Sequence, residues 1–126
     1  MTTTPDTGLD RIATSIINTV SHVAVGTGRN ESASATALGS RAFAASRSDA
    51  PVEILQPGET GEIEVVIAIK GGTEVPAGTG ISEIGVFDGD PAATGATLLF
   101  IDEFQTVTVE DGHTEEFTIP VDARRV

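Results

Sequence analysis

The chain has 126 residues and no cysteine, so we expect a single hydrophobic core, and disulfides, thiolate metal sites and cysteine nucleophiles are excluded. Nineteen acidic residues against seven basic ones give a net charge of −12, which argues against nucleic-acid binding because phosphates require clustered cations. The sequence lacks both a run of apolar residues long enough to cross a bilayer and a recognisable signal peptide, so we expect a soluble protein with no membrane partner.

Lysine is nearly absent, because Lys70 is the only one among the seven basic residues. An acidic, lysine-poor composition rich in Ala, Gly and Thr is typical of proteins from a salt-rich cytoplasm. At about 1 M salt the Debye length falls to about 3 Å, which screens the repulsion between carboxylates. We therefore expect a halophilic source, the alternative being the acidic surface of an ordinary mesophilic protein.

The first predicted element is an amphipathic helix at about residues 7–20, in which apolar residues recur at offsets of three and four. Leu9, Ile12 and Ile16 on this helix are candidates for an interface between copies, with packing inside the same chain as the alternative. Alternation of Val23 and Val25 with their neighbours, ahead of a Gly-Thr-Gly turn, then predicts a short strand. The stretch ATALGSRAFAASRS is ambiguous and is interpreted as a helical turn at Leu38 followed by extended chain.

From Pro51 onward the apolar residues follow the period of two that is typical of strands. The strongest such segment is GEIEVVIAIK, which places four aliphatic residues on one face: Ile63, Val65, Ile67 and Ile69. ISEIGVFD and ATLLFIDEF are predicted to form two further strands joined by a loop of hairpin length. In QTVTVEDGHTEEFTIPVD we expect a strand, a turn at Asp111-Gly112 and a last strand with Phe117, Ile119 and Val121 inward.

Regular short strands with Gly-rich turns predict a mainly β fold, an antiparallel β-sandwich with one N-terminal helix. We expect a single domain over residues 1–126, in which residues 21–126 form the β-rich part.

Glu83 is an acidic residue in the middle of the otherwise apolar segment ISEIGVFDGD. Strand alternation turns Ile81 and Glu83 to one face and Ser82, Ile84 and Val86 to the other. A carboxylate in this position requires a partner, because an unpaired buried charge costs several kcal/mol. We expect it to accept hydrogen bonds from backbone N–H groups of a neighbouring loop, or to pair with an arginine such as Arg41 or Arg47.

The residues after Glu83 each have a predicted structural role in the same motif. Gly85 permits a close backbone approach or a bulge, and Phe87 anchors the core at the end of the strand. Asp88 and Gly89 start a turn.

The segment ISEIGVFDGDPAATGATLLF resembles a pattern of tail-fibre and baseplate-associated structural proteins of tailed phages, in which I-x-E-x-G-[LV]-[FY]-D is followed by a short loop and G-x-T/L-L-L. HVAVGTG, with Leu38 and Arg41 after it, is similar to the segment at the start of those proteins, and TVTVEDGHTEEFTIPVD to their final hairpin. The similarity runs from about Gly8 to Asp122. The chain departs from the family in size, since many members continue into a long fibre or receptor-binding region.

Four constellations have a chemical interpretation beside a structural one. Asp88 and Asp90 form a weak candidate site for a hard cation, but the further ligands of an EF-hand are missing, which favours an acidic turn. Four glutamates suggest an acid and base pair for glycoside hydrolysis, yet the chain has no Trp or Tyr to stack on a sugar; they are Glu53, Glu59, Glu62 and Glu64.

The other two constellations are the histidines and a Gly-rich turn. His22 and His113 lack a nucleophile elbow or further metal ligands, and GTGRN lacks the spacing of a phosphate-binding loop. We therefore predict no catalytic residue, no cofactor and no metal.

The resemblance implies a non-enzymatic virion structural protein of a tailed virus, located in the tail, baseplate or fibre. Because we expect a halophilic host, we also expect an archaeal virus. The same resemblance implies that the chain contacts other virion proteins and assembles as a homo-oligomer. A trimer is favoured by analogy with the tail-fibre and baseplate-associated proteins. The alternatives are a decoration or turret protein on the head surface and, from another class, a small ligand-binding or hydrolytic cellular module.

Overall fold

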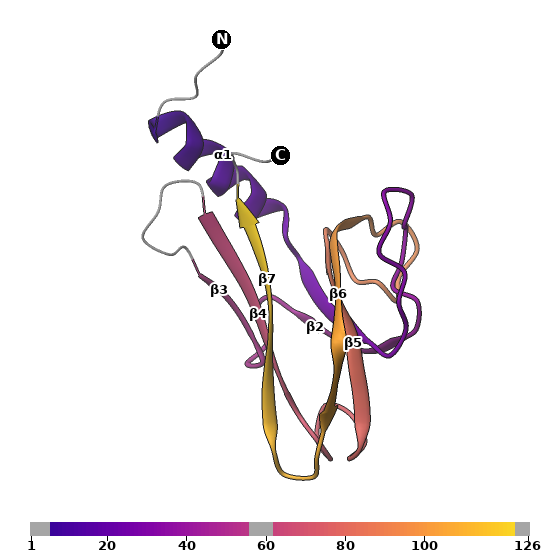
Figure 1. The fold of residues 1–126 in the computed structure, drawn as a ribbon. Helices are drawn as coiled ribbons and strands as arrows, with labels where there is room; N and C mark the ends of the chain where they lie inside the picture. Colours follow the sequence, from indigo (N-terminus) through magenta and orange to yellow (C-terminus); the bar gives the residue numbers. More distant parts are fainter. Residues whose placement is uncertain (1–5, 56–61, 123–126) are drawn as a thin grey trace.

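The computed structural model describes residues 6–55 and 62–122 and shows two antiparallel sheets packed face to face, with one helix (Figure 1). One sheet, called sheet A, has the strand order β2-β1-β5-β6, and the other, sheet B, has the order β3-β4-β7. The elements are α1 (Asp6–Thr19), β1 (His22–Gly26), β2 (Arg41–Ser46), β3 (Val52–Leu55), β4 (Glu62–Lys70), β5 (Thr79–Phe87), β6 (Leu98–Val109) and β7 (Thr114–Asp122).

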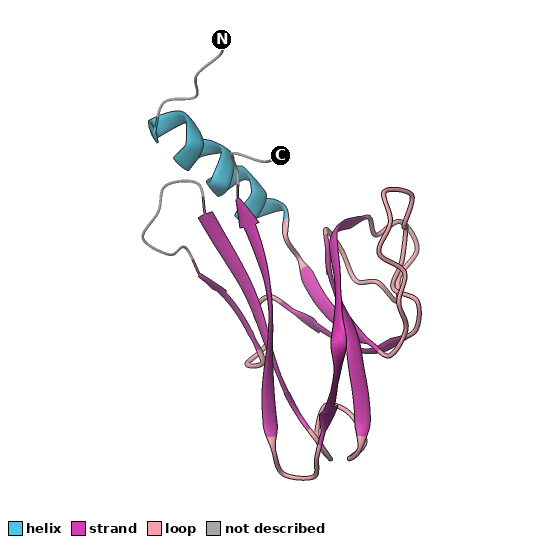
Figure 2. Cartoon of the chain, in the orientation of Figure 1, coloured by secondary structure: helices cyan, strands magenta, loops and turns pink. Residues whose placement is uncertain are grey.

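The predicted fold class, a mainly β sandwich with one N-terminal helix, is confirmed (Figure 2). The helix lies at one end of the sandwich and leads into β1, while the turn between β6 and β7 lies at the other end (Figure 1). That turn contains Gly112 at a φ of 74°, which agrees with the predicted turn at Asp111-Gly112.

The main hydrophobic core lies between the two sheets and is built from the alternation read in the sequence. Ile63, Val65, Ile67 and Ile69 of β4 are all buried in it, as are Phe117, Ile119 and Val121 of β7. The helix contributes Ala13 to the same core, and Val20, the residue directly after the helix, is also part of it. The strand β4 is central in sheet B, because it pairs with β3 on one side and β7 on the other.

A second, smaller core covers the outer face of sheet A. It consists of Ala24, Leu38 and Phe87, with Ala44, Leu98 and Ile101 packed against them. Leu38 belongs to the long loop between β1 and β2, so this loop folds over the sheet. Leu38 therefore covers part of the outer face of sheet A. The helical turn that was predicted at Leu38 does not form.

The strand pattern differs from the prediction in two places. The predicted strands ATLLFIDEF and QTVTV are parts of one continuous strand, β6, which begins at Leu98. The strand β5 pairs with it at residues 98–103 and again at residues 107–109. The short strand β3 was not separately predicted, and it pairs with the middle of β4.

Candidate functional site

The carboxylate of Glu83 is fully buried and accepts three backbone hydrogen bonds from the loop of residues 27–40. Its Oε2 accepts from the N–H of Gly28 at 3.1 Å and from the N–H of Ser40 at 2.9 Å. Its Oε1 accepts from the N–H of Gly39 at 2.8 Å. We call this arrangement the Glu83 clamp, because one charged group ties together the two ends of a loop by charge-assisted hydrogen bonds.

Glycines make room for the Glu83 clamp. A Cβ atom on Gly26 would lie 2.3 Å from Oε2 of Glu83 and 2.6 Å from the carbonyl oxygen of Ser40, which is too close for either contact. Gly28 and Gly39 lie backbone to backbone, since a Cβ on Gly28 would meet the carbonyl carbon of Gly39 at 2.8 Å. The Gly-Thr-Gly turn is thus a packing requirement of the clamp.

The side-chain alternation of β5 is interrupted at Ser82 and Glu83, where its register against β6 shifts. The Ser82 hydroxyl donates to the carbonyl oxygen of Gly28 at 2.7 Å, so both residues reach the same loop. Ile81 packs in the main core together with Ile84, and the expectation that Ile81 shares a face with Glu83 is wrong. The cause is the strand irregularity, which turns two successive side chains outward.

Of the two kinds of partner predicted for Glu83, backbone N–H groups or an arginine, the structure shows backbone N–H groups. Within the described residues, neither arginine that was considered takes this place. Arg47 donates instead to the carbonyl oxygens of Ile17 and Val20, the latter at 2.8 Å, and so satisfies the C-terminal end of α1. Arg41 lies at the start of β2 with an exposed side chain.

The other residues of the motif also take structural positions. A Cβ on Gly85 would lie 2.8 Å from Leu38 and 3.1 Å from Leu98, so Gly85 permits the close approach that was predicted. Phe87 is the last residue of β5 and is buried in the second core. Asp88 begins the loop of residues 88–97, where its Oδ1 accepts from the N–H of Thr97 at 2.6 Å.

Loops 27–40 and 88–97 lie at the same side of the molecule (Figure 1). A cavity of about 200 Å³ lies between them, lined by Thr36, Ala37, Leu38, Arg41, Phe87, Pro91 and Ala96. Loop 27–40 is also attached to β6, because the guanidinium of Arg29 donates to the carbonyl oxygen of Phe104 at 2.6 Å. The N–H of Glu103 donates to the carboxylate of Glu31 at 3.1 Å.

In Asp88 and Asp90, the weak cation candidates, one carboxylate oxygen of each side chain accepts a backbone hydrogen bond. Oδ1 of Asp90 accepts from the N–H of Ala92 at 2.9 Å, and Asp88 is bonded to Thr97 as described. In residues 6–55 and 62–122, no group of three or more potential ligands comes together that would hold a metal ion.

The remaining polar candidates are spread over the molecule. Nδ1 of His22 lies 2.8 Å from the hydroxyl of Ser21 beside α1, whereas His113 belongs to the β6–β7 turn at the other end. Glu53 and Glu64 lie on neighbouring strands of sheet B, opposite Val66 and Leu55 respectively, and Glu62 begins β4. Glu59 is outside the described residues.

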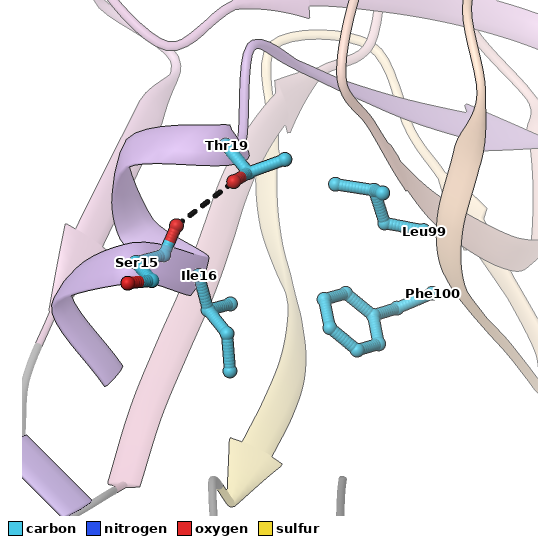
Figure 3. A pocket seen from close by; sticks show the side chains of 5 residues that line it. All are labelled: Ser15, Ile16, Thr19, Leu99 and Phe100. Carbon is cyan, nitrogen blue, oxygen red and sulfur yellow. Dashed lines mark hydrogen bonds between the residues drawn. The ribbon is translucent and has the colours of Figure 1, made fainter. Parts of the chain in front are cut away.

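The three interface candidates on α1 occupy different environments. Leu9 is buried within the chain at 8% exposure, which fits the alternative of packing inside the same chain. Ile12 is 39% exposed, and Ile16 is half-buried. Ile16 lines a cavity of about 220 Å³ together with Ser15, Thr19, Leu99 and Phe100. In this cavity Ile16 and Thr19 of α1 face Leu99 and Phe100 of β6 (Figure 3).

Three features of these sites were not predicted from the sequence. Gly39 carried no signal, because its role depends on a contact with Gly28 across the loop. The capping role of Arg47 depends on a contact with α1, thirty residues earlier in the chain. Leu99 is an extra residue in β6, since Val86 pairs with Phe100 and Phe87 with Leu98.

Comparison of the chain with known protein families and with curated proteins finds no match. Among the described residues, no helix combines the length and the apolar character needed to span a bilayer.

Proposed function

We propose that this protein is a non-enzymatic structural component of the virion of a tailed virus with a halophilic host, located in the tail, baseplate or fibre. It assembles there as a homo-oligomer, for which the resemblance favours a trimer, and it contacts other virion proteins. The proposal combines the resemblance of the motif around Glu83 with the role that this motif has in the fold.

The observation that carries the proposal is the use of the Glu83 carboxylate. Both of its oxygens accept backbone hydrogen bonds, and the residue is fully buried. A catalytic carboxylate must reach a substrate within hydrogen-bonding distance, whereas this one holds a loop on a sheet. The acidic residue in the middle of the motif is therefore explained as scaffold chemistry, which suits a building block.

The charge of the chain supports the halophilic part of the proposal. A net charge of −12 on 126 residues keeps copies apart at low salt, and molar salt screens that repulsion. An assembly of such chains is therefore expected to be stable at the ionic strength of a salt-rich environment.

Immunogold electron microscopy of purified virus particles tests the proposal. An antibody against the recombinant protein is expected to label the tail end of the particles, with pre-immune serum as the control. Label over the head would support the decoration or turret alternative. Particles without label, whose protein composition by mass spectrometry also lacks this chain, would overturn the virion role.

A ligand-binding module is the second candidate, and the cavity between loops 27–40 and 88–97 is the observation that favours it. Its volume of about 200 Å³ is below the usual range of about 300–1,000 Å³ for drug-sized ligands, so it suits a small group only. NMR titration with a panel of small metabolites would test this candidate, and shifts confined to the two loops would support it.

A further inference from the structure

An uncharged surface lies between the helix and the edge of sheet A. We define the α1–β6 surface by Ile12, Ser15, Ile16, Thr19, Leu99 and Phe100. Ile12, Ser15, Ile16 and Thr19 are spaced by three and four residues and share one side of α1. Leu99 and Phe100 face Ile16 and Thr19 from β6 across a cavity of about 220 Å³ (Figure 3).

The irregularity in β6 builds the second half of this surface. In a regular strand successive side chains point to opposite faces, so Leu99 and Phe100 would separate. The register shift between Val86 and Phe87 leaves Leu99 as an extra residue, and Leu99 and Phe100 both pack against the main core. Bulges commonly aim side chains at functional surfaces, and this one directs two large apolar groups toward α1.

The surface continues along an open strand edge. The strand β6 is the outermost strand of sheet A, and its first four residues, Leu98 to Ile101, are apolar and only half-buried. Loop 27–40 reaches the backbone of this strand at Glu103 and Phe104, which lie beyond that apolar segment. An apolar edge segment of this kind is a template for pairing with another chain.

Charge distinguishes this surface from the rest of the chain. The sequence from Ile12 to Gly28 contains no Asp, Glu, Lys or Arg, and neither does the sequence from Pro91 to Ile101. Both segments contribute to the α1–β6 surface in a chain whose net charge is −12. Two copies that met through their acidic surfaces would bring carboxylates together, whereas contact through this surface buries apolar groups and leaves the carboxylates in solvent.

We propose that the α1–β6 surface docks a second copy of this chain. The inference rests on the proposed assembly function, and it identifies the part of the molecule through which copies associate. A second copy fits better than a basic partner protein, because the surface offers no carboxylate for a cation to pair with. Association is therefore driven by apolar burial and is strengthened by salt, which weakens the repulsion between the acidic remainders.

Light scattering coupled to size-exclusion chromatography tests the inference on the full chain. We expect a mass that is a multiple of 12.9 kDa at about 1 M KCl and a larger monomer fraction at about 0.1 M. Ile12→Glu is expected to lower the association constant by about tenfold or more, because it places a charge in the buried contact. Leu55→Glu is the matched control, since Leu55 is the other large exposed apolar residue among those the structure describes, at 38% exposure against 39% for Ile12, and lies on sheet B.

A second pair of variants removes the ambiguity of fold damage. Thr19→Arg places a charge at the cavity, and a cation suits the C-terminal end of a helix, so the monomer is expected to remain folded. Asn18→Arg is its control, because Asn18 is exposed on the same helical turn and does not line the cavity. Thermal unfolding of all four variants verifies that each monomer is folded.

A wild-type chain that stays monomeric at every salt concentration would overturn the inference, as would equal effects of Ile12→Glu and Leu55→Glu. A chain that stays monomeric is the result expected if a basic partner or a small apolar ligand occupies the surface in place of a second copy. Labelling of particles tests the virion role separately. A multimer without particle label would retain the docking surface and remove the virion role, and labelled particles with a monomeric protein in solution would do the reverse.

Discussion

Replacement of Glu83 by glutamine tests whether the Glu83 clamp holds loop 27–40 on sheet A. In the better of its two orientations, the amide oxygen replaces Oε2 and still accepts from Gly28 and Ser40. The amide NH₂ then faces the N–H of Gly39, so one bond is lost and two donors oppose each other. A hydrogen bond to a charged group contributes about 1.5–3 kcal/mol, and the two remaining bonds lose their charge assistance.

The donors belong to a loop that is partly exposed, so water relieves some of this loss. We therefore expect Glu83→Gln to lower the free energy of unfolding by about 2–3 kcal/mol, within a typical total of about 5–15 kcal/mol. Urea titration followed by circular dichroism at constant KCl measures this value. Amide hydrogen exchange at Gly28, Gly39 and Ser40 is expected to accelerate more than exchange in β4.

Glu116→Gln is the control, because Glu116 is also in the middle of a strand but is exposed on β7, where a change of about 0.5 kcal/mol or less is expected. Glu83→Ala provides a second test, since formate at fixed ionic strength is expected to occupy the vacated position and to raise the stability of this variant alone. A loss below about 0.5 kcal/mol for Glu83→Gln, with unchanged exchange at the three amides, would refute the reasoning.

Three further predictions follow from the same structure. Gly26→Ala is expected to cost about 1–3 kcal/mol in urea unfolding, because its methyl group would overlap the buried carboxylate. Gly89→Ala should change little, since an added Cβ there would make only ordinary contacts with Ala96, at 3.5 Å or more. Arg47→Ala is expected to cost about 1–2 kcal/mol and to reduce helical circular dichroism, since it removes the hydrogen bonds to the carbonyl oxygens of Ile17 and Val20 at the C-terminal end of α1. An unchanged spectrum and stability would contradict this role. The midpoint of thermal unfolding of the wild type is expected to rise between about 0.1 M and about 1 M KCl, because screening relieves the repulsion of a −12 chain, and a flat or falling midpoint would argue against it.

The fold was predictable where local pattern and burial agree. The four aliphatic residues of β4 and the inward residues of β7 follow strict alternation, and all of them are buried in the main core. The need of Glu83 for a partner was also predictable, since a mid-strand carboxylate is costly when it is unpaired. The identity of that partner was left open between backbone groups and arginines, and the backbone groups of loop 27–40 provide it.

The sequence did not predict features that depend on contacts between distant segments. The two irregularities in the β5–β6 pairing reverse the faces of Ile81 and Leu99 relative to simple alternation, and neither is marked by a glycine or proline in β6. The apolar character of α1 was evident, but its division into a buried side with Leu9 and an exposed side with Ile12 required the position of the helix on the sandwich. Only the α1 half of the α1–β6 surface could therefore be predicted, because its β6 residues lie far from α1 in the sequence.

The attachment of both ends of loop 27–40 to Glu83 has a practical consequence for engineering. Both ends of this loop are fixed by the Glu83 clamp, and the segment from Ser32 to Ala35 forms an exposed turn between them. Foreign peptides or affinity tags inserted in this turn would start and finish at positions that the sandwich already holds in place. The protein is therefore a promising carrier for epitope display.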